Sequence, residues 1–435
     1  MSGAAGHMPH LYEDLDLEIS EIKDIARSLA SGGGEIKPLE KVDGQNIFFR
    51  WDSKTNRVHT ARNMSNIMQG GMTPDEFAAK WKGHPGENAF MNGFKAIEIA
   101  IRSLSREDLV DIFGEDGSRF ANAEIMYSIN PNMIVYDGNY IVLHNLQSVN
   151  PATKKTSAAP SEDFQKLVDA IEGAEAQVSN ELWSVHGPQI TALQSTPDSA
   201  EKFSAEVDSI VGPFGVGNSD TLGDFFMNWL DEKLDPVFES SGLAVKDRVE
   251  MLKRLRDLAN GAPESETKSL ADIASSATAS GKSELKKIST KKFAEEQMKI
   301  ALAPIEKAIS DFAVDILKNV RSAFIGTESQ HNTSIDSMHK RLESTISAIE
   351  SYSGNDAAQV REKLEKELAR LSGGKDSLSN VEGIVFEYPP GSGNLKKLTG
   401  NFAALNQIVG SLGRKISPKK ESYNRYPSLV SVFFG

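Results

Sequence analysis

The strands predicted for this chain fall into two groups far apart in the sequence, with a long helical stretch between them. Short apolar and alternating runs predict strands between residues 39 and 146 and again between residues 381 and 399. In the intervening stretch, apolar residues from Ile305 to Phe324 recur every three to four positions, which is typical of a helix. A shorter helix is predicted over residues 162–182. We therefore expect residues 151–379 to be mostly helical.

The composition limits the classes of function that this chain can have. Its 435 residues can form two or three domains, and the absence of cysteine excludes disulfides, iron–sulfur clusters and thiolate zinc sites. No apolar run is long enough to span a bilayer and the first residues lack a signal-peptide pattern, so we expect no membrane partner and a cytoplasmic location. The net charge of −13 argues against a uniformly basic nucleic-acid-binding surface but allows a local basic groove.

A lysine followed by an acid and a glycine stands immediately before the first buried strand. The sequence of residues 41–44 is Lys-Val-Asp-Gly, and the apolar run Ile47–Phe49 predicts the strand. A lysine at the mouth of such a strand is partly desolvated, which favours a neutral amine that can attack an electrophile. Because Asp-Gly is also a common hairpin dipeptide, the alternative interpretation is a surface turn.

Two more charged residues of the first group lie at the ends of predicted strands. Arg62 ends a hairpin, and Glu124 stands near the start of the first of three strands predicted over residues 120–127, 133–136 and 140–146. An arginine in this position can contact a sugar or a phosphate. The alternatives are a solvated arginine at a strand end and a carboxylate that caps a strand.

The second group of strands also carries charged residues. Glu382 stands near the start of the apolar segment Val381–Phe386, and Lys396 and Lys397 lie on a strand predicted over residues 394–400. Since side chains alternate along a strand, Lys396 should point away from the face that carries Lys397.

In their order along the chain, the segments around these charged residues resemble the motifs of the covalent nucleotidyltransferases. This superfamily contains DNA ligases, RNA ligases and mRNA capping enzymes. The resemblance covers about residues 1–150 and 380–410, and it is to a viral or phage type of RNA ligase more than to a cellular DNA ligase. The segments that resemble motifs I, Ia, III, IIIa, IV and V are residues 41–44, 60–62, 124–127, 140–146, 381–386 and 394–400.

The resemblance implies an α+β fold with antiparallel sheets flanked by helices. Residues 1–150 and 380–435 would form the ligase-type nucleotidyltransferase domain, and residues 151–379 a large helical insertion that either binds substrate or a protein partner or serves only as a packing module. Too little chain follows motif V for a C-terminal OB-fold. If the protein is viral, its expected location is the host cytoplasm. The tail is either a strip that follows a nucleic-acid backbone or a solvated terminus, and its basic residues are Arg414, Lys415, Lys419, Lys420 and Arg425.

The resemblance also implies an activity, in which Lys41 attacks the α-phosphate of ATP and forms a lysyl-AMP intermediate. The AMP would pass to the 5′-phosphate of an RNA or DNA end, and a 3′-hydroxyl would then displace it and join the ends. Lys397 would contact the α-phosphate, and Glu382 would bind Mg²⁺. Glu124 would accept hydrogen bonds from the ribose, and Arg62 would hold the sugar or a phosphate.

The turn residue Asp43 belongs to the predicted nucleotide site because it and the glycine after it shape the turn that aims the lysine. Three departures from the ligase pattern bear on activity: Asn46 replaces an arginine, Ala123 replaces a glycine and Thr399 replaces a second lysine. In addition, His144 and Asn145 stand where an aromatic residue and an acid are usual. Two other functions therefore stay open. One is a catalytically degenerate ligase fold that binds nucleic acid or associates with virions, and the other is a nucleotidyltransferase with a protein acceptor.

Overall fold

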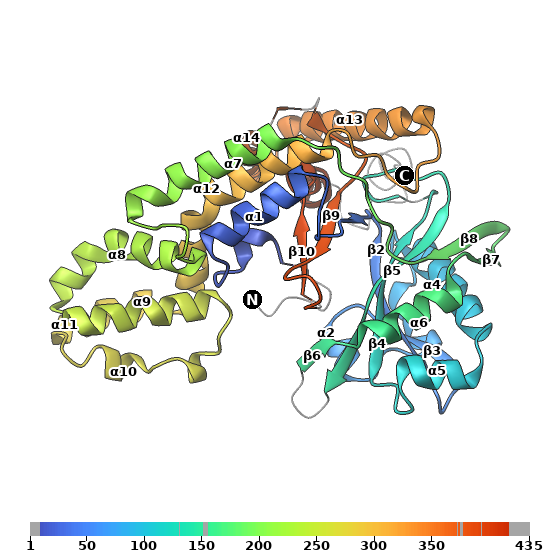
Figure 1. Cartoon of the computed structure of the whole chain (residues 1–435), viewed down its shortest axis with the longest axis horizontal. Coiled ribbons are helices and arrows are strands. Elements are labelled where there is room, and N and C mark those ends of the chain that lie inside the picture. The colour runs from blue at the N-terminus through green and yellow to red at the C-terminus, as the bar shows by residue number, and fades with distance from the viewer. Residues whose placement is uncertain are drawn as a thin grey trace.

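Two β-sheets form the centre of the computed structural model, which describes residues 9–129, 131–150, 155–371, 373–374, 377–392 and 394–416 (Figure 1). The smaller sheet is antiparallel in the order β1-β9-β10 and joins a strand from near the N-terminus to two strands from near the C-terminus. Its strands are β1 (Leu39–Lys41), β9 (Gly383–Glu387) and β10 (Leu395–Leu398).

The larger sheet has seven strands in the order β3-β2-β4-β5-β8-β7, with β6 paired to β5. Every pairing is antiparallel except that between β5 and β8. The mixed α+β class expected from the sequence is thereby confirmed. The strands are β2 (Gln45–Asp52), β3 (Arg57–Ala61), β4 (Arg119–Met126), β5 (Asn139–Asn150), β6 (Lys155–Ala158), β7 (Ala174–Val178) and β8 (Glu181–His186).

Helices cover the larger sheet because they present an apolar stripe to it. Phe90, Phe94 and Ile97 recur on one face of a helix and pack with Ile47 and Ile125 of β2 and β4. A second small cluster on the other face buries Phe48, so β2 is covered on both sides. The helices of this part are α2 (Met64–Met68), α3 (Pro74–Trp81), α4 (Glu87–Arg102), α5 (Arg106–Phe113) and α6 (Ser161–Ile171).

A second group of helices packs around the smaller sheet and extends away from both sheets (Figure 1). One core unites this group with Ile384, Phe386 and Leu398 of the smaller sheet. Its helices are α1 (Ile19–Ala30), α7 (Pro197–Val211), α8 (Leu222–Ser241), α9 (Val245–Ala259), α10 (Leu270–Ile273), α11 (Ala279–Ile288) and α12 (Lys291–Leu317), with the 3₁₀ turns η1 (Leu11–Glu13), η2 (Gly212–Phe214) and η3 (Glu264–Glu266).

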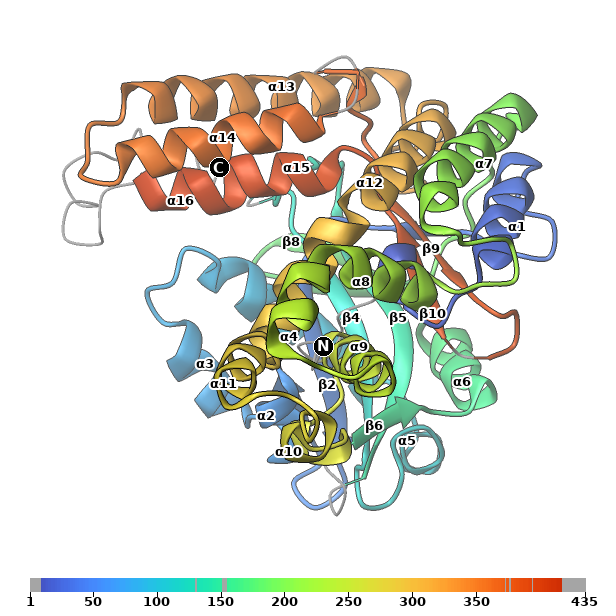
Figure 2. The same ribbon diagram turned by 90° about the vertical axis from the view of Figure 1, so that its left-hand side faces the viewer.

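A third group of helices lies side by side along one edge of the molecule (Figure 2). Its core includes Met338 and Leu342 together with Val42, Met133 and Ile134, so these helices support the turn that follows Lys41. The elements are α13 (Glu328–Ser351), α14 (Ala357–Arg370), α15 (Phe402–Asn406), the π-helical turn η5 (Gln407–Leu412) and α16 (Gly413–Ile416).

Two sequence-based expectations about local structure are wrong. Residues 133–136 form an irregular bend instead of a strand, because the backbone N–H groups of Met133 and Ile134 donate to a side chain, that of Asp43. The helix expected over residues 162–182 ends at Ile171, and the strands that follow it pair with β5. Residues 155–186 therefore extend the larger sheet, whereas the sequence placed them in the helical middle.

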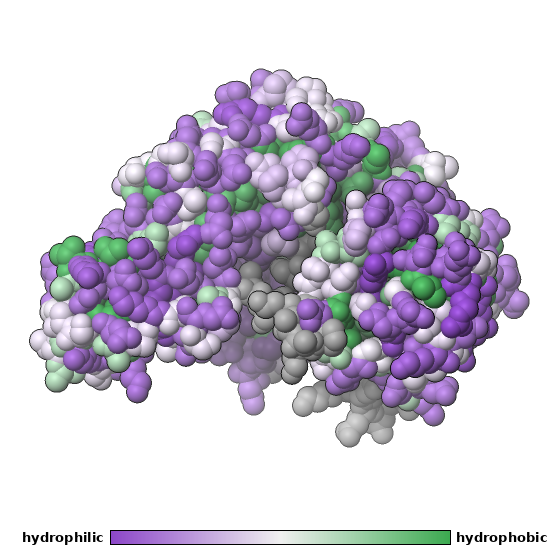
Figure 3. All heavy atoms as spheres, turned by 60° about the horizontal axis from the view of Figure 1, so that its bottom comes forward, coloured by the Kyte–Doolittle hydropathy of each residue, from purple (hydrophilic) through white to green (hydrophobic). Residues whose placement is uncertain are grey.

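Large apolar side chains that remain exposed are scattered. Among the described residues they include Ile129, Ile190, Val245 and Ile300, which come from different elements. Figure 3 agrees, since hydrophobic residues on the face shown there form small patches among hydrophilic ones. In the part of the chain that the structure describes, no helix is both long and apolar enough to cross a membrane.

Candidate functional site

A cavity of about 580 Å³ lies where the turn after Lys41 meets the larger sheet and the third helix group. Its volume is in the range of small-molecule sites. Five of the six residues that the sequence singled out for the site line it, and Arg341 and Arg414 reach it from α13 and α16. The five are Lys41, Asp43, Arg62, Glu124 and Glu382.

Lys41 and Glu382 form an ion pair at the cavity wall. The Nζ–Oε2 distance is 2.6 Å, and each side chain is 13% exposed. The pairing follows from the antiparallel register of β1 and β9, which sets Lys41 opposite Gly383, the neighbour of Glu382. Two residues separated by most of the chain are thus in direct contact.

The expectation of a neutral Lys41 amine is wrong for this state of the protein. Burial by itself lowers the pKa of Lys41, but the charges of Glu382 and Glu124 outweigh burial, so the pKa of Lys41 is raised. The ammonium form is therefore stabilised, and the amine must lose its proton before it can act as a nucleophile.

Three carboxyl groups share this single ammonium group. Burial raises the pKa of Glu382 to about 8, with Lys41 opposing the shift and the charges of Asp43 and Glu124 adding to it. Glu124 is also buried, but the neighbouring His144 and Lys41 and the N–H of Gly44 keep its pKa below the ordinary value. The three carboxyl groups outnumber the one ammonium group, and this excess of acid suits a ligand that brings cations with it.

Glu124 projects from β4 toward the turn after Lys41. Its Oε2 accepts a hydrogen bond from the N–H of Gly44 at 3.1 Å. The Nε2 atom of His144, on the neighbouring strand β5, lies 3.9 Å from the same oxygen, which is too far for a hydrogen bond. One oxygen of Glu124 thus fixes the turn, and the residue still lines the cavity.

Asp43 holds the turn after Lys41 in place through hydrogen bonds to the backbone. Its Oδ2 accepts hydrogen bonds from the N–H groups of Met133 at 2.5 Å and Ile134 at 2.8 Å, and its own N–H donates to the Tyr136 hydroxyl at 2.8 Å. Burial raises the pKa of Asp43 to about 6, although the two N–H donors and Lys41 oppose the shift. With its carboxylate engaged by the backbone, Asp43 is best placed to position Lys41.

Gly44 is needed because the turn passes very close to β4. A Cβ atom at Gly44 would lie 2.9 Å from both the Cβ of Glu124 and the carbonyl oxygen of Ile125. We expect Gly44→Ala to lower the free energy of unfolding by about 1–3 kcal/mol, the usual cost of overpacking, as measured by urea unfolding. Gly217→Ala is the control, since a Cβ there would meet only Asp220 Oδ2, at the ordinary contact distance of 3.7 Å. Equal destabilisation by both changes would contradict the close approach.

Arg62 lies against two aromatic rings at the far side of the cavity. Its Cζ is 4.7 Å from the ring centroid of Phe90 and 5.6 Å from that of Trp81, and these two rings stack on each other. Its Nη1 is buried without a hydrogen-bond partner among the described residues, and the same is true of Gln45 Oε1 and Trp81 Nε1. Burial lowers the pKa of Arg62. Polar atoms left unpaired around a cavity are a signal of ligand binding.

Lys397 lies on the same face of the smaller sheet as Lys41. Strand β9 sets Gly383 opposite Lys41 and Val385 opposite Lys397, and residues two apart on a strand share a face. Burial lowers the pKa of Lys397, and the nearby charge of Lys41 adds to this effect. Lys397 is not among the residues that line the 580 Å³ cavity, so the structure sets it beside the site and not within it.

The predicted alternation of the two lysines on β10 is confirmed. Lys396 is buried and forms an ion pair with Asp14 on the face opposite to Lys397.

Two of the three departures from the ligase pattern have a structural role here. Ala123 is fully buried at the centre of the larger sheet, opposite Ile47. Asn46 donates to the Oδ1 of Asn122 at 2.5 Å, so it belongs to a polar pair at the cavity edge. The third, Thr399, is buried with a hydroxyl that has no partner among the described residues.

Arg341 is the functional candidate that the sequence analysis missed. It comes from α13, inside the predicted insertion, and its guanidinium donates to the carbonyl of Asn132. Its Nε is buried and has no partner within the described residues. Its place in the site depends on tertiary packing, so no local pattern marks it.

The basic tail is described only in part. Arg414 lines the cavity, and Lys415 pairs with Asp356 at 2.9 Å. The other basic residues of the tail, Lys419, Lys420 and Arg425, lie outside the described residues.

The residues around the cavity could hold Mg²⁺ only if a bound ligand supplied further oxygen atoms. Among the described residues, no group of three or more His, Asp or Glu side chains is arranged to hold a metal ion. Mg²⁺ in nucleotide sites is usually held by one or two carboxylates together with phosphates, and Glu382 supplies one such carboxylate. Comparison of the chain with protein-family models, curated proteins and solved structures gives no match.

Proposed function

We propose that this protein is an ATP-dependent polynucleotide ligase, similar to RNA ligases, that acts through a covalent lysyl-AMP intermediate. The observation that carries the proposal is the convergence of Lys41, Glu124 and Glu382 on one cavity from three distant parts of the chain. Arg62, Arg341 and Arg414 add cations around the same cavity, as a bound polyphosphate requires.

In the first step, the Lys41 nitrogen attacks the α-phosphorus of ATP, a P–N bond forms, and pyrophosphate leaves with the electrons of the broken P–O bond. Glu382 Oε2, 2.6 Å from Nζ, is the nearest acceptor for the proton that the ammonium group loses, and it accepts in the ionised form, which predominates above a pKa of about 8. Glu382 would also hold Mg²⁺ beside the phosphates, and the ion would neutralise their developing charge.

In the following steps, the oxygen of a 5′-phosphate attacks the same phosphorus and releases Lys41, which leaves a 5′-5′ phosphoanhydride. A 3′-hydroxyl then attacks the 5′-phosphate, and AMP leaves as the phosphodiester forms. Glu124 supports the ribose, and Arg62 binds a phosphate or the sugar. Asp43 keeps the lysine aimed, and Lys397 adds positive charge behind it.

The proposal is tested by incubating the purified protein with α-labelled ATP or GTP and Mg²⁺. The expected result is an acid-labile labelled protein with ATP, and joining of labelled strands when 5′-phosphate and 3′-hydroxyl ends are then added. Absence of an adduct with either nucleotide, from protein shown to be free of bound AMP, would overturn the enzyme assignment. An adduct that never passes to nucleic-acid ends would favour a protein acceptor.

Arg62 gives a second test of the nucleotide site. Arg62→Met keeps the apolar stem over the rings but removes the charge, so we expect the KM for ATP in adduct formation to rise roughly 10- to 100-fold, the value of a hydrogen bond to a charged group. Arg57→Met is the matched control, because Arg57 pairs with Glu98 on the surface. An unchanged KM in Arg62→Met would remove Arg62 from the site.

A further inference from the structure

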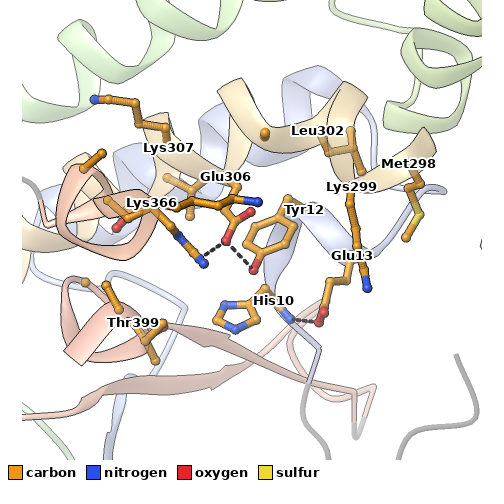
Figure 4. A pocket seen from close by; sticks show the side chains of 18 residues that line it. His10, Tyr12, Glu13, Met298, Lys299, Leu302, Glu306, Lys307, Lys366 and Thr399 are labelled. Atoms are coloured by element: carbon orange, nitrogen blue, oxygen red, sulfur yellow. Dashed lines mark hydrogen bonds and ion pairs between the residues drawn. The ribbon is translucent and has the colours of Figure 1, made fainter. Parts of the chain in front are cut away.

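A second cavity, of about 470 Å³, lies between η1, α12, α14 and the segment of residues 399–404 (Figure 4). It is separate from the nucleotide site described above, because the two cavities share no lining residue. Its size again suits a ligand as large as a nucleotide.

The walls of this second cavity suit a flat, partly apolar group. Met298, Leu302 and Ile309 of α12 form an apolar side. Across from them, the rings of His10 and Tyr12 are stacked, with centroids 5.0 Å apart and an angle of 17° between their planes. Aromatic rings beside aliphatic side chains are a common surface for nucleobases.

Cations stand at the mouth of the second cavity. Lys299 and Lys366 are exposed and form no ion pair with another described residue. Arg370 is balanced by an ion pair with Glu306. Glu306 also accepts a hydrogen bond from the Tyr12 hydroxyl at 3.3 Å, and Figure 4 shows these two side chains pointing toward each other. Glu306 is engaged by Arg370, and the two lysines outnumber Glu13, the other acid of the lining, which leaves a net attraction for an anionic group.

An unpaired hydroxyl points to a ligand as well. Thr399 lines the cavity, is 9% exposed, and its Oγ1 has no hydrogen-bond partner among the described residues. A buried hydroxyl without a partner is costly unless a ligand completes it.

Thr399 also links the second cavity to Lys41. A Cβ atom at Gly383, on the face that carries Lys41, would lie 2.9 Å from the Cγ2 of Thr399. Lys397, two residues before Thr399, lies near enough to Lys41 and to Glu13 of the second cavity for both charges to act on it. One face of the smaller sheet therefore leads from the nucleotide site to the second cavity.

We propose that the second cavity binds the 5′-terminal nucleotide of a polynucleotide acceptor, with its base between α12 and the stacked His10 and Tyr12 rings. The 5′-phosphate lies toward Thr399 and Lys397, on the side nearest Lys41. This assignment rests on the proposed ligase function, for which it supplies the acceptor site.

The assignment is tested by direct binding, without ATP, so that its outcome does not depend on catalysis. Short 3′-labelled single strands with a 5′-phosphate or a 5′-hydroxyl are titrated with the full chain, and fluorescence anisotropy is measured. We expect the 5′-phosphate to tighten binding by at least about tenfold, because hydrogen bonds to a charged phosphate are stronger than those to a neutral hydroxyl. Equal affinity for the two strands would overturn the assignment.

A double variant tests whether the lysines at the second cavity contribute to this binding. The double change Lys299→Glu and Lys366→Glu should weaken binding of the 5′-phosphorylated strand about tenfold or more. The matched control is Lys282→Glu with Lys286→Glu, two exposed lysines of α11 whose change alters the net charge by the same amount. Equal weakening by both pairs would indicate a general charge effect and would overturn the assignment.

Thr399→Val provides a variant of nearly unchanged volume that removes the unpaired hydroxyl. It should reduce the preference for the 5′-phosphate several-fold and leave the melting temperature equal or higher, because no described residue forms a hydrogen bond with that hydroxyl in the free protein. A protein that forms no AMP adduct but shows these effects would lose the ligase proposal and keep the binding site. A protein that forms the adduct but shows none of them would lose only the binding site.

Discussion

Replacing Lys41 by arginine is expected to abolish the labelled AMP adduct, a loss of at least about a thousandfold in the first step. Arginine keeps the positive charge beside Glu382, so the acid cluster retains its shared cation and the fold should hold. The guanidinium group does not lose its proton in proteins and is a poor nucleophile. The measurement is incorporation of label from α-labelled ATP, with circular dichroism to show that the variant is folded.

Arginine is a better replacement for Lys41 than alanine, because Lys41→Ala would leave Glu382, Glu124 and Asp43 buried without their shared cation. Removing one partner of a buried ion pair typically costs about 3–5 kcal/mol, so an inactive alanine variant could simply be unfolded. Lys54→Arg is the control, since Lys54 is exposed in the turn between β2 and β3. A folded Lys41→Arg protein that still forms the adduct would assign the covalent bond to another residue.

The parts of the site that were predicted from the sequence are those with a local pattern. Glu382 stands just before a short apolar strand and Glu124 lies within one, not at the strand start expected from the sequence, and the structure brings both to Lys41. Neither position could be joined to Lys41 by periodicity alone, because β1 and β9 pair across more than 300 residues of chain. The resemblance to ligase motifs, and not the local patterns, predicted that they would meet.

The parts that were not predicted depend on contacts made only in three dimensions. The ion pair that raises the pKa of Lys41 requires Glu382, so desolvation of the lysine alone gave the wrong protonation state. Residues 133–136 have the composition of a strand, but two of their N–H groups donate hydrogen bonds to the Asp43 carboxylate instead of to a neighbouring strand. Arg341 reaches the cavity from α13, a helix whose sequence shows only ordinary amphipathic spacing.

The acid cluster leads to the second large effect, a fall in the stability of the ligand-free protein as pH rises. An ordinary glutamate has a pKa of 4.5, and burial raises that of Glu382 to about 8. Between these two values the folded protein holds a proton that the unfolded chain has released. Stability therefore decreases with increasing pH across this window, by up to about 1.4 kcal/mol per pH unit for one group.

Glu382→Gln separates this contribution from the rest of the protein, because glutamine has nearly the same shape and does not titrate. The measurement is the free energy of unfolding from urea titrations at several values between pH 5 and pH 8, without nucleotide and with a chelator. We expect the wild-type protein to lose a few kcal/mol relative to the variant over this range. Parallel stability curves for the two proteins would mean that Glu382 ionises normally, and the acid cluster would then impose no need for a cation in the bound ligand.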